Sequence, residues 1–80
     1  MIVILKKRAA KELSKLPLPE RNKVVKKLRL LKTDSYSGKL LQGEYEGLLS
    51  LKAWPYRIIY EVKKDSILVY SIKHRQGAYQ

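Results

Sequence analysis

Residues 48–79 read LLSLKAWPYRIIYEVKKDSILVYSIKHRQGAY and predict three consecutive β-strands. Ala53-Trp54-Pro55 separates a strand at 48–52 from one at 56–63, and Lys64-Asp65 separates the second from a strand at 66–74. Short runs of β-branched and aromatic residues bounded by such turn residues are typical of hairpins. We therefore expect two hairpins that together form an antiparallel meander.

Side chains along a strand point alternately to opposite faces of a sheet, so parity divides each strand into a core row and an open row. The expected core row consists of Leu49 and Leu51, then Tyr56, Ile58, Tyr60 and Val62, and finally Leu68, Tyr70 and Ile72. The open face then gathers four cationic residues, Lys52, Arg57, Lys73 and Arg75. His74 falls on the core side by parity, although it lies at a strand end, where alternation is least strict.

The first half of the chain predicts one strand and two helices. Residues 1–5 (MIVIL) are apolar and rich in β-branched residues, which favours a strand buried on both faces or nearly so. An amphipathic helix at 6–16 ends at Pro17, and a second begins near Pro19. The apolar positions at helical spacing are Ala9, Leu13 and Leu16 in the first helix and Val24, Leu28 and Leu31 in the second.

These elements combine into one expected architecture. The polar segment 33–38 is a connection, and we expect Leu40 and Leu41 to anchor it to the core. The predicted fold class is α+β in the order β-α-α-β-β-β, with a small antiparallel-rich sheet and a helix hairpin packed on one face. At 80 residues, 1–80 is expected to be a single domain with one small core.

Composition limits the possible functions. The 18 Lys and Arg outnumber the 7 Asp and Glu, so the formal net charge is +11. Such a field attracts polyanions, and nucleic acid, an acidic protein segment or an anionic membrane are its natural partners. No apolar run approaches the length of a spanning helix, which disfavours the membrane and favours a cytoplasmic location. With no cysteine and a single histidine, we expect no metal and no other cofactor.

A family resemblance is carried by several short motifs at a consistent spacing. They are Leu41-x-Gly43, Gly47-Leu-Leu-Ser-Leu-Lys52, Tyr56-Arg57-Ile-Ile-Tyr60-Glu61-Val62, His74-Arg75 and a near-terminal Tyr79. In these motifs, and in the order of its predicted elements, the chain resembles the RelE/ParE toxin superfamily of toxin–antitoxin systems. The resemblance implies a RelE-like fold and a small toxin that is held inactive by a cognate antitoxin encoded beside it.

The superfamily contains two classes of activity, and the fold alone does not choose between them. RelE-like members enter the ribosomal A site and cut translated mRNA there. ParE-like members inhibit DNA gyrase and are not nucleases. The function that we expect is that of a ribosome-dependent endoribonuclease (mRNA interferase). The alternative is a ParE-like gyrase inhibitor or a catalytically inert basic relative that binds a protein.

The resemblance also implies roles for individual residues. Arg57 matches the arginine that RelE-type nucleases use at the scissile phosphate, and Arg75 matches the arginine that ends their last strand. Tyr79 resembles their C-terminal tyrosine, although it follows Arg75 by only four residues. Lys52 falls at another basic position of the family.

Two positions depart from the RelE pattern. Where that enzyme has two lysines earlier on the same strand as Lys52, this chain has Leu48 and Ser50. This departure weakens the expectation of a general base at that edge. It supports the alternative of a non-enzymatic toxin.

RNA can be cut without a metal when its own 2′-hydroxyl attacks the neighbouring phosphate. The reaction needs a proton acceptor, a proton donor for the leaving 5′-oxygen and positive charge at the phosphate. Arginine suits the last task, because its charged guanidinium matches phosphate oxygens bidentately, so we expect Arg57 and Arg75 to clamp the phosphate. His74, Tyr79, Lys52 or groups of the substrate and ribosome would transfer protons.

The remaining candidates are RNA-binding residues. Trp54 and Tyr79 are able to stack on bases, and Lys52 and Lys73 are able to contact the RNA backbone. Each has a plainer interpretation: the lysines as solvated surface charges, and Trp54 as part of a packed turn. Arg57 has one too, because it can pair structurally with Glu61.

Overall fold

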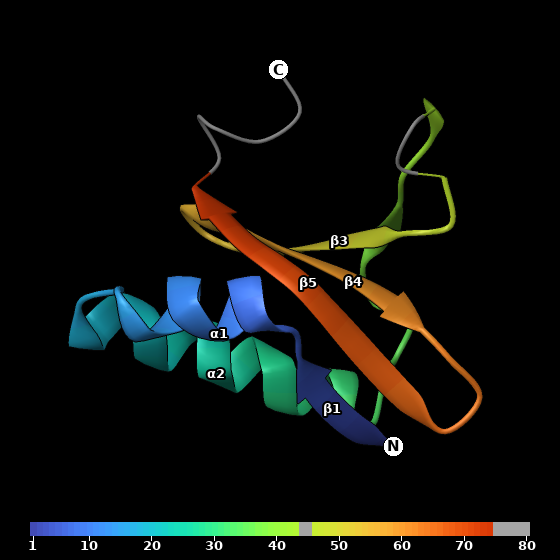
Figure 1. Ribbon diagram of the computed structural model, residues 1–80, viewed down its shortest axis with the longest axis horizontal. Helices are drawn as coiled ribbons and strands as arrows, with labels where there is room; N and C mark the ends of the chain where they lie inside the picture. The colour runs from blue at the N-terminus through green and yellow to red at the C-terminus, as the bar shows by residue number, and fades with distance from the viewer. Residues whose placement is uncertain (44–45, 75–80) are drawn as a thin grey trace.

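The computed structural model describes residues 1–43 and 46–74. Its elements in chain order are β1 (Ile2–Leu5), α1 (Lys7–Ser14), α2 (Leu18–Leu31), β2 (Lys39–Leu40), β3 (Leu49–Ala53), β4 (Tyr56–Val62) and β5 (Ser66–His74). The five strands form one sheet in the order β1-β5-β4-β3-β2, in which β1 runs parallel to β5 and the other neighbours are antiparallel. The two helices lie side by side against one face of this sheet (Figure 1). The expected α+β fold with a helix hairpin on one face is therefore confirmed.

Both helices bury the residues that their spacing predicted. Ala9 of α1 is buried, and so are Val24, Leu28 and Leu31 of α2. Proline in the first turn of α2 and Glu20 beside it suit a helix start, where one backbone N–H is unpaired anyway and negative charge is favoured. In the described part of the chain, no helix is both long enough and apolar enough to cross a bilayer.

The helix-covered face of β3 and β4 follows the predicted parity. Leu49, Leu51, Ile58 and Tyr60 are all buried in the hydrophobic core. The register is continuous between these strands, because Leu49 lies opposite Tyr60 and Leu51 lies opposite Ile58. The short Trp54-Pro55 connection between Ala53 and Tyr56 sets this register, so the predicted hairpin positions the two strands correctly.

Tyr60 is the largest fully buried side chain, and its hydroxyl is satisfied by the backbone. The Gly38 N–H donates to the Tyr60 hydroxyl at 3.0 Å, and the hydroxyl donates to the Ser35 carbonyl at 2.9 Å. A Cβ on residue 38 would lie 2.7 Å from that hydroxyl, so only glycine allows this approach. Tyr60 thereby ties the start of β2 to the centre of the sheet.

The strand β1 is not buried on both faces, which corrects the prediction from its apolar sequence. It lies at the edge of the sheet beside β5, and its exposure alternates. Val3 and Leu5 pack against the core, whereas Ile2 is 65% exposed and Ile4 is 42% exposed. An all-apolar run of four residues has no internal alternation to reveal which face remains open.

The prediction for β5 is wrong in its first half, because the strand pairing slips by one residue. Ile59 lies opposite Ser71, but the next residue, Tyr60, lies opposite Val69. Tyr70 is therefore the extra residue of a β-bulge, and parity reverses across it. Ile67 and Val69 belong to the core in place of Leu68 and Tyr70, whereas Ile72 is buried as predicted.

The strand β2 is absent from the predicted order. Lys39 lies opposite Ser50, and Leu40 lies opposite Leu49. Leu40 is 62% exposed, so the expectation that it anchors the connection to the core is wrong. Leu41 is half-buried and donates its backbone N–H to the Leu48 carbonyl.

Candidate nucleic-acid interface

Three cations form a row across adjacent strands on the face that the helices leave open. Lys52 of β3 lies opposite Arg57 of β4, and Arg57 lies opposite Lys73 of β5. Lys52 is exposed, and the other two are half-buried. Side chains in such pairs have Cβ atoms about 5 Å apart, and like charges at that distance destabilise a sheet. We call Lys52, Arg57 and Lys73 the cation row, and its geometry is suited to an anionic ligand.

A second row lies two residues further along the strands. Ser50, Ile59 and Ser71 are directly opposite one another, and all three are buried. Lys39 of β2 continues this row beside Ser50. The Ser50 Oγ has no hydrogen-bond partner within the described residues. A buried hydroxyl without a partner is costly, so this position calls for a physical explanation.

A cleft of about 390 Å³ joins these features at the edge of the sheet. It is lined by Lys27, Ser37, Lys39, Leu41, Ser50, Leu51, Lys52 and Arg57. Leu51 belongs to the covered face and Lys52 to the open face, so the cleft follows the edge of β3 beyond the short β2. Four of its lining residues are cations, contributed by α2, β2, β3 and β4.

The sequence did not single out Lys27 or Lys39. A two-residue strand has no periodicity, so β2 and the place of Lys39 beside Ser50 could not be seen. Lys27 lies on a helix with several other lysines, and only its packing distinguishes it. The one signal present was Gly38 directly before Lys39, since an isolated glycine beside a strand marks a close backbone approach.

His74 and Trp54 are the other predicted site residues that the structure describes. His74 pairs with Tyr56 rather than with Arg57, and the two rings make an edge-to-face contact with centroids 5.4 Å apart. Its row is the one that faces the helices, so its predicted part in proton transfer gains no support from the strand register. Trp54 is 60% exposed at the β3–β4 connection, beside Lys52. Base stacking by Trp54 stays a prediction.

Arg75 and Tyr79 lie outside the described residues. The predicted clamp of Arg57 and Arg75 and the predicted role of Tyr79 therefore stay predictions. Within 1–43 and 46–74, no three His, Cys, Asp or Glu side chains gather closely enough to hold a metal ion.

Glu61 has partners at the other end of the open face. Its Oε1 accepts a hydrogen bond from the Tyr70 hydroxyl at 2.7 Å, and its Oε2 lies 3.2 Å from the Lys63 Nζ. The Tyr70 hydrogen bond, followed by Lys63, lowers the pKa of Glu61. The same hydrogen bond raises the pKa of Tyr70. Glu61 therefore stays an anion and takes these partners in place of the pairing with Arg57 that the sequence left open.

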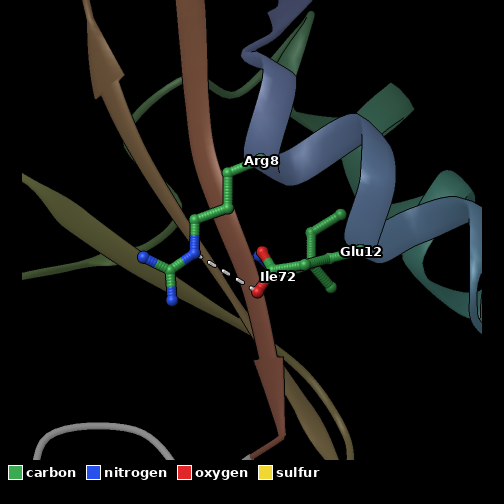
Figure 2. A network of polar contacts seen from close by, with 3 residues as sticks. All are labelled: Arg8, Glu12 and Ile72. Carbon is green, nitrogen blue, oxygen red and sulfur yellow. Dashed lines mark hydrogen bonds and ion pairs between the residues drawn. The ribbon is translucent and has the colours of Figure 1, made fainter.

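A carboxylate on α1 holds the end of β5 in place. The Glu12 Oε1 accepts a hydrogen bond from the Ile72 N–H at 2.9 Å, and its Oε2 lies 3.5 Å from the Arg8 Nε (Figure 2). Ile72 lies two residues beyond Tyr70 and pairs with Ile58 of β4, whereas β1 pairs with β5 only as far as Val69. Glu12 thus fixes the backbone immediately before Lys73, the last member of the cation row.

Comparison with known families gives one match over almost the whole chain. The model for the ParE toxin of the type II toxin–antitoxin system parDE matches residues 3–79. A search of curated protein sequences finds no match.

Solved structures with the same fold include toxins of both named classes. A chain of the RelBE2 toxin–antitoxin complex from Mycobacterium tuberculosis is 26% identical with a TM-score of 0.85, over 92% of this chain and 96% of that one. The isolated E. coli RelE toxin is 25% identical with a TM-score of 0.76, over 91% and 82%. A chain of the chromosomal ParDE system from P. aeruginosa, at 22% identity and a TM-score of 0.71 over 92% and 95%, shows the fold alone.

Proposed function

The chain belongs to the ParE toxin family of type II toxin–antitoxin systems, within the RelE/ParE superfamily, and we propose that it is a ribosome-dependent endoribonuclease that cleaves translated mRNA. The observation that carries this proposal is the cation row of Lys52, Arg57 and Lys73 on the open face. Like charges on adjacent strands repel one another, and a phosphate backbone that binds across the row would offset that repulsion.

Arg57 is the central residue of the proposed site. It occupies the middle of the row, so a phosphate bound there is also close to Lys52 and Lys73. Its guanidinium can hold two phosphate oxygens and stabilise the charge that develops as the 2′-hydroxyl attacks. By resemblance to RelE-type nucleases, Arg75 joins Arg57 at the phosphate.

Proton transfer is assigned by resemblance and by chemistry. Tyr79 is the proposed donor or acceptor nearest the C-terminus, and His74 is a second candidate because histidine is the side chain that most often transfers protons in catalysis. Trp54, exposed beside Lys52, is the proposed platform for a base. The reaction needs no metal, because the attacking oxygen belongs to the RNA.

The proposed partners are the ribosomal A site with its mRNA, in the cytoplasm, and a cognate antitoxin. Structures with this fold include RelBE complexes from E. coli and Pyrococcus horikoshii OT3. We propose that an acidic or amphipathic segment of the antitoxin neutralises the toxin by covering the helices or the basic face.

The proposal is tested by inducing the protein in cells and mapping the 5′ ends of mRNA. Cuts within codons of translated messages are expected. They should disappear in Arg57→Ala and fall strongly in Arg57→Lys, which keeps the charge but loses bidentate geometry. Lys64→Ala, in the β4–β5 turn, is the control that should cleave normally. Cleavage that persists in Arg57→Ala would refute the proposed role of the cation row.

A second function is favoured by one observation. Ser50 and Leu48 replace the two lysines that the RelE pattern has on this strand, and a chain without them suits a ParE-like gyrase inhibitor. Induction would then cause DNA damage and loss of gyrase supercoiling while mRNA stays intact. Absence of any growth effect would contradict both functions.

A further inference from the structure

We propose that Lys27, Lys39 and the hydroxyl of Ser50 form a subsite for the RNA phosphate next to the one held by Arg57. We call it the flanking-phosphate subsite. It rests on the proposed function, since it assumes that the ligand of the cation row is RNA. It assigns a role to Lys27 and Lys39, which lie outside the sequence motifs, and to Ser50, which the proposed cleavage site does not use.

The first argument is the spacing of the two rows. Lys39 stands beside Ser50, and Ser50 is two residues from Lys52 on the same face of β3. Two residues along a strand span roughly 6–7 Å, which is comparable to the separation of successive phosphates in a single nucleic-acid strand. A phosphodiester at Arg57 therefore places its neighbour at the level of Lys39.

The second argument is the direction of the cleft. It runs from the open face around the edge of β3 to Lys27 on α2. Within the described residues, ion pairs involve Arg8 with Glu12 and Lys63 with Glu61, so the lysines of the cleft are not neutralised by them. A strand that leaves the cation row along the cleft meets Lys39 and then Lys27.

The third argument is the unpartnered hydroxyl. Ser50 is buried and lines the cleft, and its Oγ has no hydrogen-bond partner in the part of the chain that the structure describes. A hydroxyl donates readily to a phosphate oxygen. A bound phosphate would thus supply a hydrogen-bond partner for the Ser50 hydroxyl.

The favoured ligand is a nucleic-acid strand rather than an acidic peptide. The lysines and the serine contact phosphate without reading sequence, and the exposed Trp54 in the β3–β4 connection offers a flat surface for a base. The carboxylates of an acidic peptide would form ion pairs with the lysines but would not stack on Trp54. An acidic peptide is the competing outcome of the test below.

The test measures binding of the full-length toxin, freed of antitoxin, to fluorescent oligouridylates made uncleavable by 2′-O-methylation. Lys27→Ala/Lys39→Ala should weaken binding of a six-nucleotide strand about tenfold and reduce the slope of log affinity against log salt by about 1.4. Lys7→Ala/Lys11→Ala is the matched control, because it removes the same charge from exposed positions of α1. Equal losses in the two double variants would refute the subsite and leave only a general charge effect.

A length series locates the second phosphate. The wild-type toxin should bind a trinucleotide with two phosphodiesters several-fold more tightly than a dinucleotide with one, and Lys27→Ala/Lys39→Ala should abolish this gain. Arg57→Ala should weaken both lengths and keep the gain. If the double variant instead loses affinity for polyglutamate and binds oligouridylate normally, the subsite is a protein-docking site and the proposal fails.

Ser50→Ala separates ligand binding from structure. Removal of an unpartnered buried hydroxyl should leave the unfolding midpoint unchanged or raise it, while oligouridylate binding falls several-fold. A lower midpoint with unchanged binding would make the hydroxyl structural and overturn its role. The readouts also separate the two proposals: loss of mRNA cleavage tests Arg57, whereas these binding data stand whether or not the chain cleaves RNA.

Discussion

The two faces of the sheet are equally buried at their centre but differ in how their polar groups are satisfied. Leu49 and Ser50, neighbours on β3 that point to opposite faces, are each 5% exposed. On the covered face, the buried hydroxyl of Tyr60 has both a donor and an acceptor. On the open face, the Ser50 hydroxyl has no hydrogen-bond partner among residues 1–43 and 46–74, and the cation row places like charges side by side. At this level of the sheet, an unsatisfied hydroxyl rather than greater exposure distinguishes the open face from the covered one.

The strongest test of this comparison uses adjacent isoleucines on opposite faces. Ile58→Ala removes a fully buried side chain from the core and should lower the free energy of unfolding by about 2–5 kcal/mol. Ile59→Ala, on the open face and outside the core cluster, should lower it by less, although Ile59 is also buried. Urea denaturation of both variants provides the measurement. Equal losses would show that the open face is a second core.

Glu12 tests whether the covered face supports the open one. Glu12→Ala leaves the buried Ile72 N–H without its acceptor and should lower the free energy of unfolding by about 1–3 kcal/mol. Glu12→Gln keeps an acceptor for this N–H and should retain most of the free energy of unfolding that Glu12→Ala loses. Arg8→Ala removes an exposed ion pair and should change it by less than about 1 kcal/mol. If Arg8→Ala matches Glu12→Ala in thermal unfolding, the ion pair and not the hydrogen bond is what stabilises β5.

Tyr60→Phe should break the satisfied network and lower the free energy of unfolding by about 1–2 kcal/mol, because the Gly38 N–H and the Ser35 carbonyl lose their partner. Burial raises the pKa of Tyr60, so the folded state holds its proton longer than the unfolded state. Tyr60 therefore contributes stability below its ordinary pKa, and this contribution is lost as pH rises through the raised pKa. Urea denaturation at a series of pH values between 9 and 11 should show that the free energy of unfolding falls less steeply with pH in Tyr60→Phe than in the wild type. An equal fall in both proteins would contradict the role of Tyr60 in this pH dependence.

The smallest expected effect concerns Glu61. Its pKa is lowered chiefly by the Tyr70 hydroxyl and then by Lys63, so its contribution to stability is present above its ordinary pKa and is lost as pH falls through the lowered value. Tyr70→Phe should raise the pKa of Glu61 more than Lys63→Ala does, as measured by carboxyl NMR titration. The reverse order would show that charge, and not the hydrogen bond, sets this pKa.

The sequence was informative where periodicity is regular. Both helices, the β3–β4 hairpin and the core positions Ile58 and Tyr60 followed from spacing. The neighbouring positions of Lys52, Arg57 and Lys73 followed from the same parity. The predicted parity of β5 is wrong only before the bulge, and Lys73 lies after it.

The remaining features depend on contacts between distant segments. The bulge inserts one residue between Val69 and Ser71 in the pairing of β5 with β4, and no local pattern at Tyr70 reveals it. Two-residue β2 forms because Tyr60 holds Gly38, a contact across 22 positions. The cleft takes Lys27 from α2 and Lys39 from β2, which only the fold brings together, so a linear pattern could not predict it.

The extra residue in β5, Tyr70, determines which face of the sheet the following side chains occupy. Removing Tyr70 would turn Ser71 and Lys73 inward under the helices and Ile72 outward to solvent, if the segment before them keeps its place. If this strand were replaced by that of a homologue without the bulge, the side chains after residue 70 would therefore point to the opposite faces of the sheet, even if the sequence beyond residue 70 were identical. In a chimera, the junction should lie before Tyr70, toward the β4–β5 turn, so that the extra residue and Lys73 come from the same protein.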